Sequence, residues 1–418
     1  MNIVRIYLVS LAVVFTLFFT FFNNEQKKKK EQTNKQENDF YLALNEFSAT
    51  LNIIKQYYYQ DIPMVDLIRS ANKGIMESLD PYSTMLDIKD SQELSNFTTG
   101  NFTGVGLQIY KNKDSLIEVI SPLHNSPAFK AGIMAGDIIT KINQEVINKQ
   151  TSLQQVVENL QGKTGTKINI TLARKKQYYN VSVTREVITT QPVISYQDGN
   201  IGYIKIATFN ENSRSQFINH INKLKKNKVD AFIIDLRNNP GGLVNQAVLI
   251  ASDLLNGGNI VSLSGKNPAD NQVFFAETGD ITEGKPIILL INNNSASASE
   301  ILSGALQENN RALVIGTTSY GKGSIQSIIP LDNKKNIKIT TALYYLPSGK
   351  TIHKIGIKPD IVVFENGKTC KQCNNEILEQ YKKESDSYIE KSNHYIDHQL
   401  IFAKKIINKY KKSEIKNV

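Results

Sequence analysis

Apolar residues follow the spacing of amphipathic helices over residues 40–88, which predicts two or three helices there. The positions that carry this pattern are Leu44, Phe47, Leu51, Ile54, Leu67, Ile68, Ile75 and Leu79. A turn-forming run, Leu-Asp-Pro-Tyr-Ser at 79–83, ends the helical stretch. The polar and charged residues 25–38 before it have the composition of a solvated linker.

Residues 97–187 show the short strands and frequent turns of a small β domain. A glycine turn at 104–106 runs into a strand, and a short helix from Ser126 stops at Gly132. Further strands are predicted at 116–120, 138–142, 168–172 and 179–184, with a second helix at 152–160.

Residues 188–365 alternate strand and helix, which predicts an α/β layered domain. The apolar runs 231–236 and 287–291 are continuous, as in strands of a sheet that is buried on both faces. Other strands are predicted at 202–206, 313–316, 325–331, 337–345 and 360–364, and helices at 213–224, 243–255 and 298–307. The tail 366–418 is polar, with one amphipathic helix that we expect to be peripheral (Leu400, Ile401, Ala403, Ile406).

Composition adds little to this division. A chain of 418 residues suggests two or three domains, and its 40% hydrophobic and 21% charged residues are ordinary for a globular protein. The net charge of +10 is spread along the chain, and no nucleic-acid-reading motif accompanies it, so we expect no nucleic-acid partner. Cys370 and Cys373 form one C-x-x-C pair without further metal ligands nearby, so a small disulfide loop or two incidental thiols are expected, and no metal or cofactor.

The N-terminus carries an apolar run at 6–22, preceded by Arg5 and followed by the lysines 27–30. Residues 1–24 are therefore predicted to be a membrane anchor or a signal segment. Large residues occupy the place of a cleavage site, which favours the anchor. The lysine run on the C-terminal side conflicts with export under the positive-inside rule.

Two strand-to-helix turns carry the candidate chemistry. Residues 238–242, Asn-Asn-Pro-Gly-Gly, open one helix, and residues 295–299, Ser-Ala-Ser-Ala-Ser, open the next. Each helix start offers unpaired N–H groups, and two starts side by side would form an oxyanion hole for acyl transfer. The simpler interpretation is a capping box, Ser297-x-x-Glu300. Spacing alone does not choose a nucleophile among the three serines.

Lys322 lies between two glycines and suggests a base for such a serine. The segment 316–322 nearly matches a phosphate-binding loop, but Gly323 replaces the required Ser or Thr, and a strand follows instead of a helix. In an extended chain, Gln326 would share the face of Lys322 and could hold its amine. An exposed, charged lysine is the alternative. A Ser–His–Asp triad is weakly supported, because three histidines lie in separate segments without an evident carboxylate (His124, His220, His353).

The chain resembles the C-terminal processing peptidases, also called tail-specific proteases. The resemblance is carried by motifs at 74–83, 104–107, 131–139, 235–242, 295–300, 320–326 and 356–360, in the family's order. It implies Ser297 as the nucleophile, Lys322 as the base and Gln326 as the residue that orients it, with the N–H groups of Gly242 and Ala298 as oxyanion donors.

The same resemblance identifies residues 97–187 as a PDZ domain. Its glycine loop, Gly104, Val105, Gly106 and Leu107, would hold the C-terminal carboxylate of a protein or peptide substrate. A ligand-free β domain is the alternative. A dinucleotide site is excluded, because the third glycine is absent and a strand follows. Some relatives carry an arginine where this chain has Gln161, which puts activation through that arginine in doubt.

The fold class expected is therefore a multidomain α/β (α+β) chain with a core of the ClpP/crotonase type. Its predicted parts are 1–24, anchor or signal; 25–38, linker; 39–96, helical region; 97–187, PDZ domain; 188–365, Ser/Lys protease core; and 366–418, helical tail. The expected function is serine endopeptidase action near protein C-termini, in the periplasm or on a membrane facing it, with homo-oligomers left open. A catalytically silent PDZ scaffold is the alternative.

Overall fold

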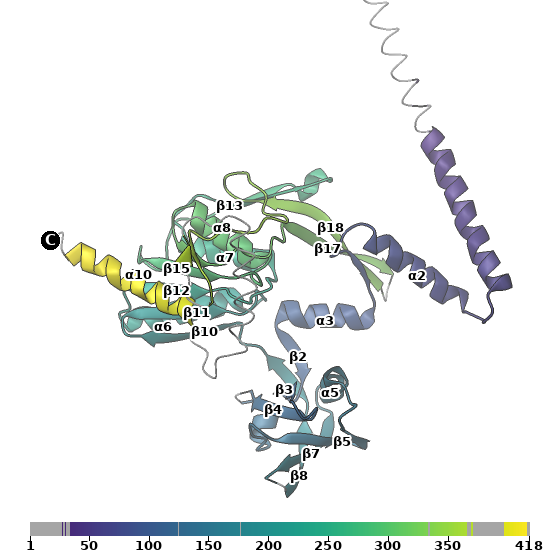
Figure 1. The fold of residues 1–418 in the computed structure, drawn as a ribbon, viewed down its shortest axis with the longest axis horizontal. Coiled ribbons are helices and arrows are strands. Elements are labelled where there is room, and N and C mark those ends of the chain that lie inside the picture. The colour runs from purple at the N-terminus through teal and green to yellow at the C-terminus, as the bar shows by residue number, and fades with distance from the viewer. Residues whose placement is uncertain are drawn as a thin grey trace, which may run out of the picture. The chain divides into compact units, whose positions relative to one another are not determined.

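The computed structural model describes residues 27, 30, 34–123, 125–175, 177–332, 335–365, 369–370 and 397–415. The predicted anchor at 1–24 and Cys373 lie outside these residues. In the part of the chain that is described, no helix is both long and apolar enough to span a bilayer. The chain divides into one unit of residues 1–85 and a second of residues 86–418, and Figure 1 shows the ribbon.

The first unit is helical, as the spacing of its apolar residues predicts. Residues 34–57 are helical, and α2 spans Met64–Glu77. The run at 79–83 forms the predicted turn, because the Asp80 carboxylate accepts hydrogen bonds from the N–H groups of Tyr82 and Ser83. The short strand β1 follows at Thr84–Leu86.

The second unit begins with α3 and a small β domain. Its sheet has the order β3-β4-β5-β7-β8, with β6 paired to β5, and encloses one apolar core. Because β2 pairs antiparallel with β9, the chain enters and leaves this domain along one ribbon. The bounds are α3 Ile88–Thr99, β2 Asn101–Gly104, β3 Leu107–Lys111, β4 Ile117–Pro122, α4 Pro127–Lys130, β5 Ile138–Ile142, β6 Glu145–Val146, α5 Leu153–Leu160, β7 Lys167–Arg174, β8 Gln177–Thr184 and β9 Glu186–Thr189.

The α/β core is built on a sheet of order β10-β11-β12-β15-β16-β19-β20. The strands from β11 to β19 run parallel, and every residue of β12 and β15 is buried, as their continuous apolar runs predict. The bounds are β10 Val193–Asp198, β11 Ile201–Ile206, α6 Ser213–Lys226, β12 Ala231–Asp235, α7 Val244–Leu254, β15 Ile287–Ile291, α8 Ala298–Glu308, β16 Leu313–Gly316, β19 Ile361–Val363 and β20 Thr369–Cys370.

A second sheet of the core joins β17, β18, β13 and β14 in that order. The strands β17 and β18 follow the Gly-Lys-Gly segment at 321–323, called the lysine loop below, and match their predicted ranges closely. The strands β13 and β14 were not expected from the sequence. The bounds are β13 Asn259–Gly265, a 3₁₀ turn at Pro268–Asp270, β14 Gln272–Phe275, β17 Ser324–Asp332 and β18 Lys335–Tyr345.

Helix α10 (His398–Ile415) corrects the expectation of a peripheral tail helix. Its Ala403 and Ile407 are buried in a cluster with side chains of β11, β12, β15 and β16, on the face opposite α6, α7 and α8 (Figure 1). A parallel sheet needs cover on both faces, and the amphipathic pattern did not reveal which surface the helix would cover.

Polar contacts also hold α10. Both terminal nitrogens of Arg237 donate to the Asp397 carboxylate at 2.7 Å, and the same side chain bonds Asp235. Burial acts to raise the pKa of Asp397, but the hydrogen bonds and charge of Arg237 outweigh it and lower that pKa. Arg237 thus connects α10 to the end of β12, where the first candidate turn begins.

Candidate active site

The two strand-to-helix turns lie side by side because β12 and β15 are neighbouring parallel strands. Asn238 N–H donates to Asn292 Oδ1 at 2.9 Å, and the Asn292 amide donates back to Asn238 Oδ1. Asn239 is fully buried, and its carbonyl accepts from Ala296 N–H at 3.0 Å. These bonds fix the two helix starts relative to one another.

The structure separates the three serines that sequence spacing could not. Ser295 Oγ donates to Leu236 O at 2.9 Å, and Ser299 Oγ donates to Asn239 O at 3.0 Å, so both buried hydroxyls are engaged within the turns. Ser297 instead sits at the start of α8 with φ 55° and ψ −114°, a backbone conformation that is strained for a residue with a side chain. Similar strain at a strand-to-helix turn presents the nucleophile in other hydrolases, and Ser297 is 8% exposed, whereas Ser295 and Ser299 are fully buried.

Glycines bring the neighbouring turn against Ser297. A Cβ atom at Gly241 would lie 2.9 Å from Ser297 Cβ and 3.0 Å from Ala298 N, and one at Gly242 would lie 2.1 Å from Phe209 O. Both glycines have φ between 101° and 139°, which side-chain-bearing residues rarely adopt. Only glycine therefore allows this approach.

Two N–H groups at this junction have no acceptor among the described residues. Gly241 N–H donates to Asn239 Oδ1 at 2.9 Å, but Gly242 N–H and Ala298 N–H donate to no described group. Ala298 is the first residue of α8, where a helix leaves its N–H groups unpaired. Two unpaired N–H groups at neighbouring helix starts are the kind of donors that an oxyanion hole needs.

Glu300 joins the turn at 295–299, called the serine turn below, to the lysine loop. Its Oε2 accepts from Ser297 N–H at 2.8 Å and from Lys322 N–H at 2.9 Å, while Oε1 accepts from Gly321 N–H at 2.7 Å. Burial raises the pKa of Glu300, although the hydrogen bonds it accepts, including one from Ser319, oppose that shift. The predicted capping box accounts for the hydrogen bond from Ser297 N–H to Glu300. It did not predict the hydrogen bonds from Gly321 and Lys322 N–H to the same carboxylate.

The lysine loop packs tightly against the segment that follows β18. A Cβ atom at Gly323 would lie 2.7 Å from His353 N, and one at Gly321 would lie 3.0 Å from Gly356 N. Lys322 itself is half-buried. The two glycines thus let the loop lie against residues 353–356, where a side chain at either position would clash.

Gln326 lies in β17, and its amide nitrogen donates to Ser324 Oγ at 3.0 Å and to Thr340 Oγ1 at 3.1 Å. Its predicted role in orienting Lys322 stays a prediction. The histidines give a triad no support: His353 Nδ1 is buried without a partner among the described residues, His220 Nδ1 contacts Ser195, and His124 lies outside the described residues.

The glycine loop of the small β domain also presents backbone donors. Gly104 pairs with Glu186 in the ribbon, and the carbonyls of Val105 and Gly106 accept from Ala128 and Leu123. In the described part of the chain, no acceptor takes the N–H groups of Val105 and Gly106. Leu107 then starts β3, which is an edge strand of its sheet. Donors followed by an open edge suit an extended peptide that ends in a carboxylate.

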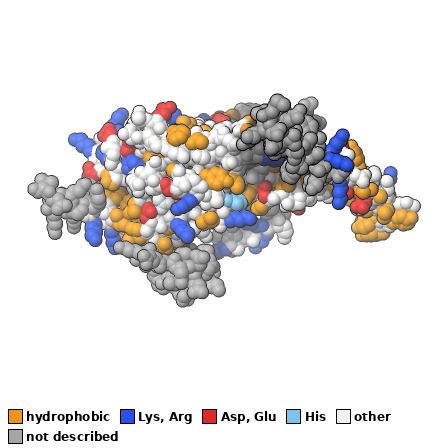
Figure 2. All heavy atoms as spheres, turned by 90° about the horizontal axis from the view of Figure 1, so that it is seen from above, with side chains coloured by type: hydrophobic (Ala, Val, Ile, Leu, Met, Phe, Trp, Pro, Cys, Tyr) orange, Lys and Arg blue, Asp and Glu red, His pale blue; other side chains and the backbone are white. Residues whose placement is uncertain are grey.

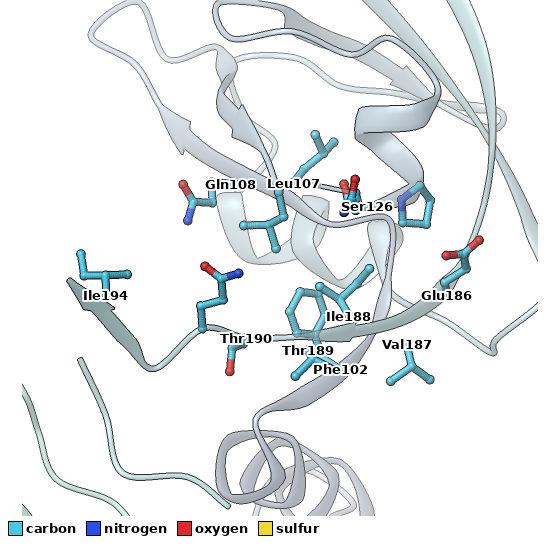
Figure 3. A pocket seen from close by; sticks show the side chains of 14 residues that line it. Phe102, Leu107, Gln108, Ser126, Glu186, Val187, Ile188, Thr189, Thr190 and Ile194 are labelled. Atoms are coloured by element: carbon cyan, nitrogen blue, oxygen red, sulfur yellow. The ribbon is translucent and has the colours of Figure 1, made fainter. Parts of the chain in front are cut away.

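A pocket of about 510 Å³ opens beside this loop, on the side of the connecting ribbon (Figure 3). Phe102 and Ile188, paired across β2 and β9, form its floor, and Leu107 belongs to both the pocket and the loop. At the position of the missing arginine, Gln161 follows α5, and the guanidinium of Arg185 donates to the carbonyls of Asn159 and Leu160 at that helix end.

Comparison with known proteins decides the family. Residues 200–363 match the model of peptidase family S41, and residues 104–184 match the model of a PDZ domain. A carboxy-terminal-processing protease of Bartonella bacilliformis is 40% identical over 337 residues, which are 79% of this chain and 77% of that protein. The chain belongs to peptidase family S41.

Other relatives share a lower sequence identity with this chain. The carboxy-terminal processing protease CtpA of Bacillus subtilis is 35% identical over 312 residues, 74% of this chain and 66% of that protein. A probable CtpA-like serine protease of Staphylococcus aureus is 32% identical over 323 residues, 77% of this chain and 64% of that protein. A solved photosystem II D1 C-terminal processing protease is 29% identical, covers 74% of this chain and 86% of its own, and superposes with a TM-score of 0.46.

The chain is thus a serine peptidase that carries a PDZ domain, and both expectations from the sequence are confirmed. The matched ranges lie inside the predicted PDZ domain and protease core, whose exact boundaries stay predictions.

On the face in Figure 2, basic side chains are scattered among acidic and apolar ones.

Proposed function

We propose that Ser297 is the nucleophile and Lys322 the base of this S41 peptidase. One observation carries the proposal: Ser297 has a strained backbone at a helix start, where the N–H group of Ala298, like that of Gly242 in the neighbouring turn, has no acceptor among the described residues. Glu300 supports the pairing, because one of its oxygens binds the backbone of both residues.

In the proposed mechanism, Ser297 Oγ attacks the carbonyl carbon of a peptide bond while its proton passes to the uncharged amine of Lys322. The carbonyl oxygen becomes negative and is stabilised by the N–H groups of Gly242 and Ala298. The C–N bond then breaks, the lysine returns the proton to the leaving amine, and an acyl-enzyme remains. Water attacks that ester with the help of the same lysine and releases the acid and Ser297.

A serine-directed acylating probe is expected to label the purified protein once, on the peptide that contains Ser297. Mass spectrometry locates the label, and the Ser295 and Ser299 hydroxyls in the same peptide are distinguished by fragmentation. A label on either of those serines, or none at all in a folded protein, would contradict the assignment. The second result would favour a silent PDZ scaffold.

We further propose that the PDZ domain captures the free C-terminus of a protein substrate, with Gly104 to Leu107 around the carboxylate. An unstructured substrate with an amidated C-terminus should then show a KM about tenfold higher than its free acid, because the loop's N–H groups lose a charged acceptor. A matched pair of substrates, with equal sequence and different termini, measures this. Equal KM values would remove the PDZ loop from substrate recognition.

We also propose that the enzyme works outside the cytoplasm, tethered through residues 1–24. The apolar run at 6–22 supports this proposal, and the lysines at 27–30 oppose it. Digestion of the protein by a protease added outside intact protoplasts or spheroplasts tests the location, since a cytoplasmic chain would survive. Sedimentation of the purified chain measures whether it forms homo-oligomers.

A further inference from the structure

A buried tyrosine contacts both the serine turn and the lysine loop. Tyr344, in β18, is fully buried among apolar side chains of the core. Its hydroxyl lies 2.6 Å from Lys322 O and 3.2 Å from Ser297 O. Its backbone N–H donates to Gly323 O at 3.0 Å. The hydroxyl and the backbone N–H of Tyr344 therefore both bind the lysine loop, and the hydroxyl also reaches the Ser297 carbonyl.

The hydroxyl has a single proton to donate. The shorter contact, to Lys322 O, is the main hydrogen bond, and Ser297 O receives the weaker branch of the same bond. Because the Tyr344 hydroxyl is buried, water cannot replace either carbonyl as its acceptor. The hydroxyl therefore makes both contacts only while the two loops keep this separation.

Tyr344 complements Glu300. Glu300 binds the N–H groups of Ser297 and Lys322, and Tyr344 binds the carbonyl groups of the same two residues. The backbones of nucleophile and base are therefore held together at both polar ends of each residue. Ser297, at φ 55°, needs such support, since a strained conformation persists only where its surroundings enforce it.

We propose that Tyr344 is a positioning residue that sets the distance between Ser297 and Lys322. The proposal rests on the Ser297–Lys322 assignment above. Proton transfer needs the two side chains within hydrogen-bond reach, and a displacement of about 1 Å can cost on the order of 100-fold in rate. Tyr344 acts through the two backbones, so its loss should slow the chemical step and leave substrate binding nearly unchanged.

The test is Tyr344→Phe, which removes one oxygen and keeps the ring. We expect kcat on an unstructured protein substrate to fall by about 10- to 100-fold, with KM within about twofold of wild type. The rate is expressed per active site titrated with the acylating probe, so that unfolded molecules do not count. Tyr345→Phe is the matched control, because the neighbouring side chain leaves the strand on its other face, and its kcat should stay within about twofold.

The outcomes separate this proposal from the one on which it rests. Wild-type kcat per titrated site in Tyr344→Phe, with Ser297→Ala and Lys322→Ala inactive, overturns the role of Tyr344 alone. Fewer titratable sites with unchanged kcat would show a merely structural residue and would overturn it as well. Activity in Ser297→Ala would remove both proposals. If phenylalanine prevents folding, 4-fluorophenylalanine at position 344 fills the hydroxyl's volume without a donor, and the same kcat comparison applies.

Discussion

Ser297→Ala is expected to lower kcat by about 10⁶-fold, because removal of a catalytic serine leaves only binding and the oxyanion donors. Ser295→Ala and Ser299→Ala supply matched controls within the same five-residue turn. Their hydroxyls bond Leu236 O and Asn239 O, so each loss should lower the free energy of unfolding by about 1–3 kcal/mol, while folded molecules keep kcat within about tenfold.

Steady-state cleavage of an unstructured protein, together with thermal unfolding of each variant, checks this contrast. The comparison is between kcat and the free energy of unfolding in the three Ser→Ala variants. We expect a loss of kcat in Ser297→Ala and a loss of stability in the other two. Substantial turnover by Ser297→Ala, or a catalytic collapse in folded Ser295→Ala, would show that the strained backbone at Ser297 does not mark the nucleophile.

Lys322→Arg should lower kcat by about 10²- to 10⁴-fold, the usual range for loss of a general base, which is a smaller loss than that from Ser297→Ala. Arginine keeps the positive charge at every accessible pH and so offers no lone pair for the serine proton. Raising the pH should therefore fail to restore the rate. Lys358→Arg, an exposed lysine in the segment after β18, is the conservative control and should retain full activity.

Lys322→Ala extends the test, because a small primary amine added to the buffer can occupy the space left by the side chain. We expect partial recovery of kcat in that variant and none in Lys322→Arg, where the guanidinium fills the site. Recovery in both variants, or undiminished cleavage by either, would exclude Lys322 as the base.

The layered core was predictable from the sequence because its pattern is local. Continuous apolar runs at 231–236 and 287–291 became β12 and β15, which are buried throughout. The position of α10 was not predictable, since an amphipathic helix shows that it has an apolar face but not which surface that face covers. The strands β13 and β14 were missed as well.

The candidate site was likewise predictable only in part. The motifs indicated the two helix starts and the lysine loop, but the choice among three serines depended on resemblance. In the structure, that choice has a physical basis in the bonds of Ser295 and Ser299 and the backbone of Ser297. The links made by Glu300 and Tyr344 join residues about 20 to 50 positions apart, which no spacing rule connects.

The cover that α10 gives to the sheet also bears on the order of biosynthesis. All the strands of that sheet leave the ribosome before residues 397–415, so during synthesis one face of the sheet lacks its apolar cover and Arg237 lacks Asp397. The turn at 238–242, which follows Arg237, is then held by fewer contacts than in the completed chain.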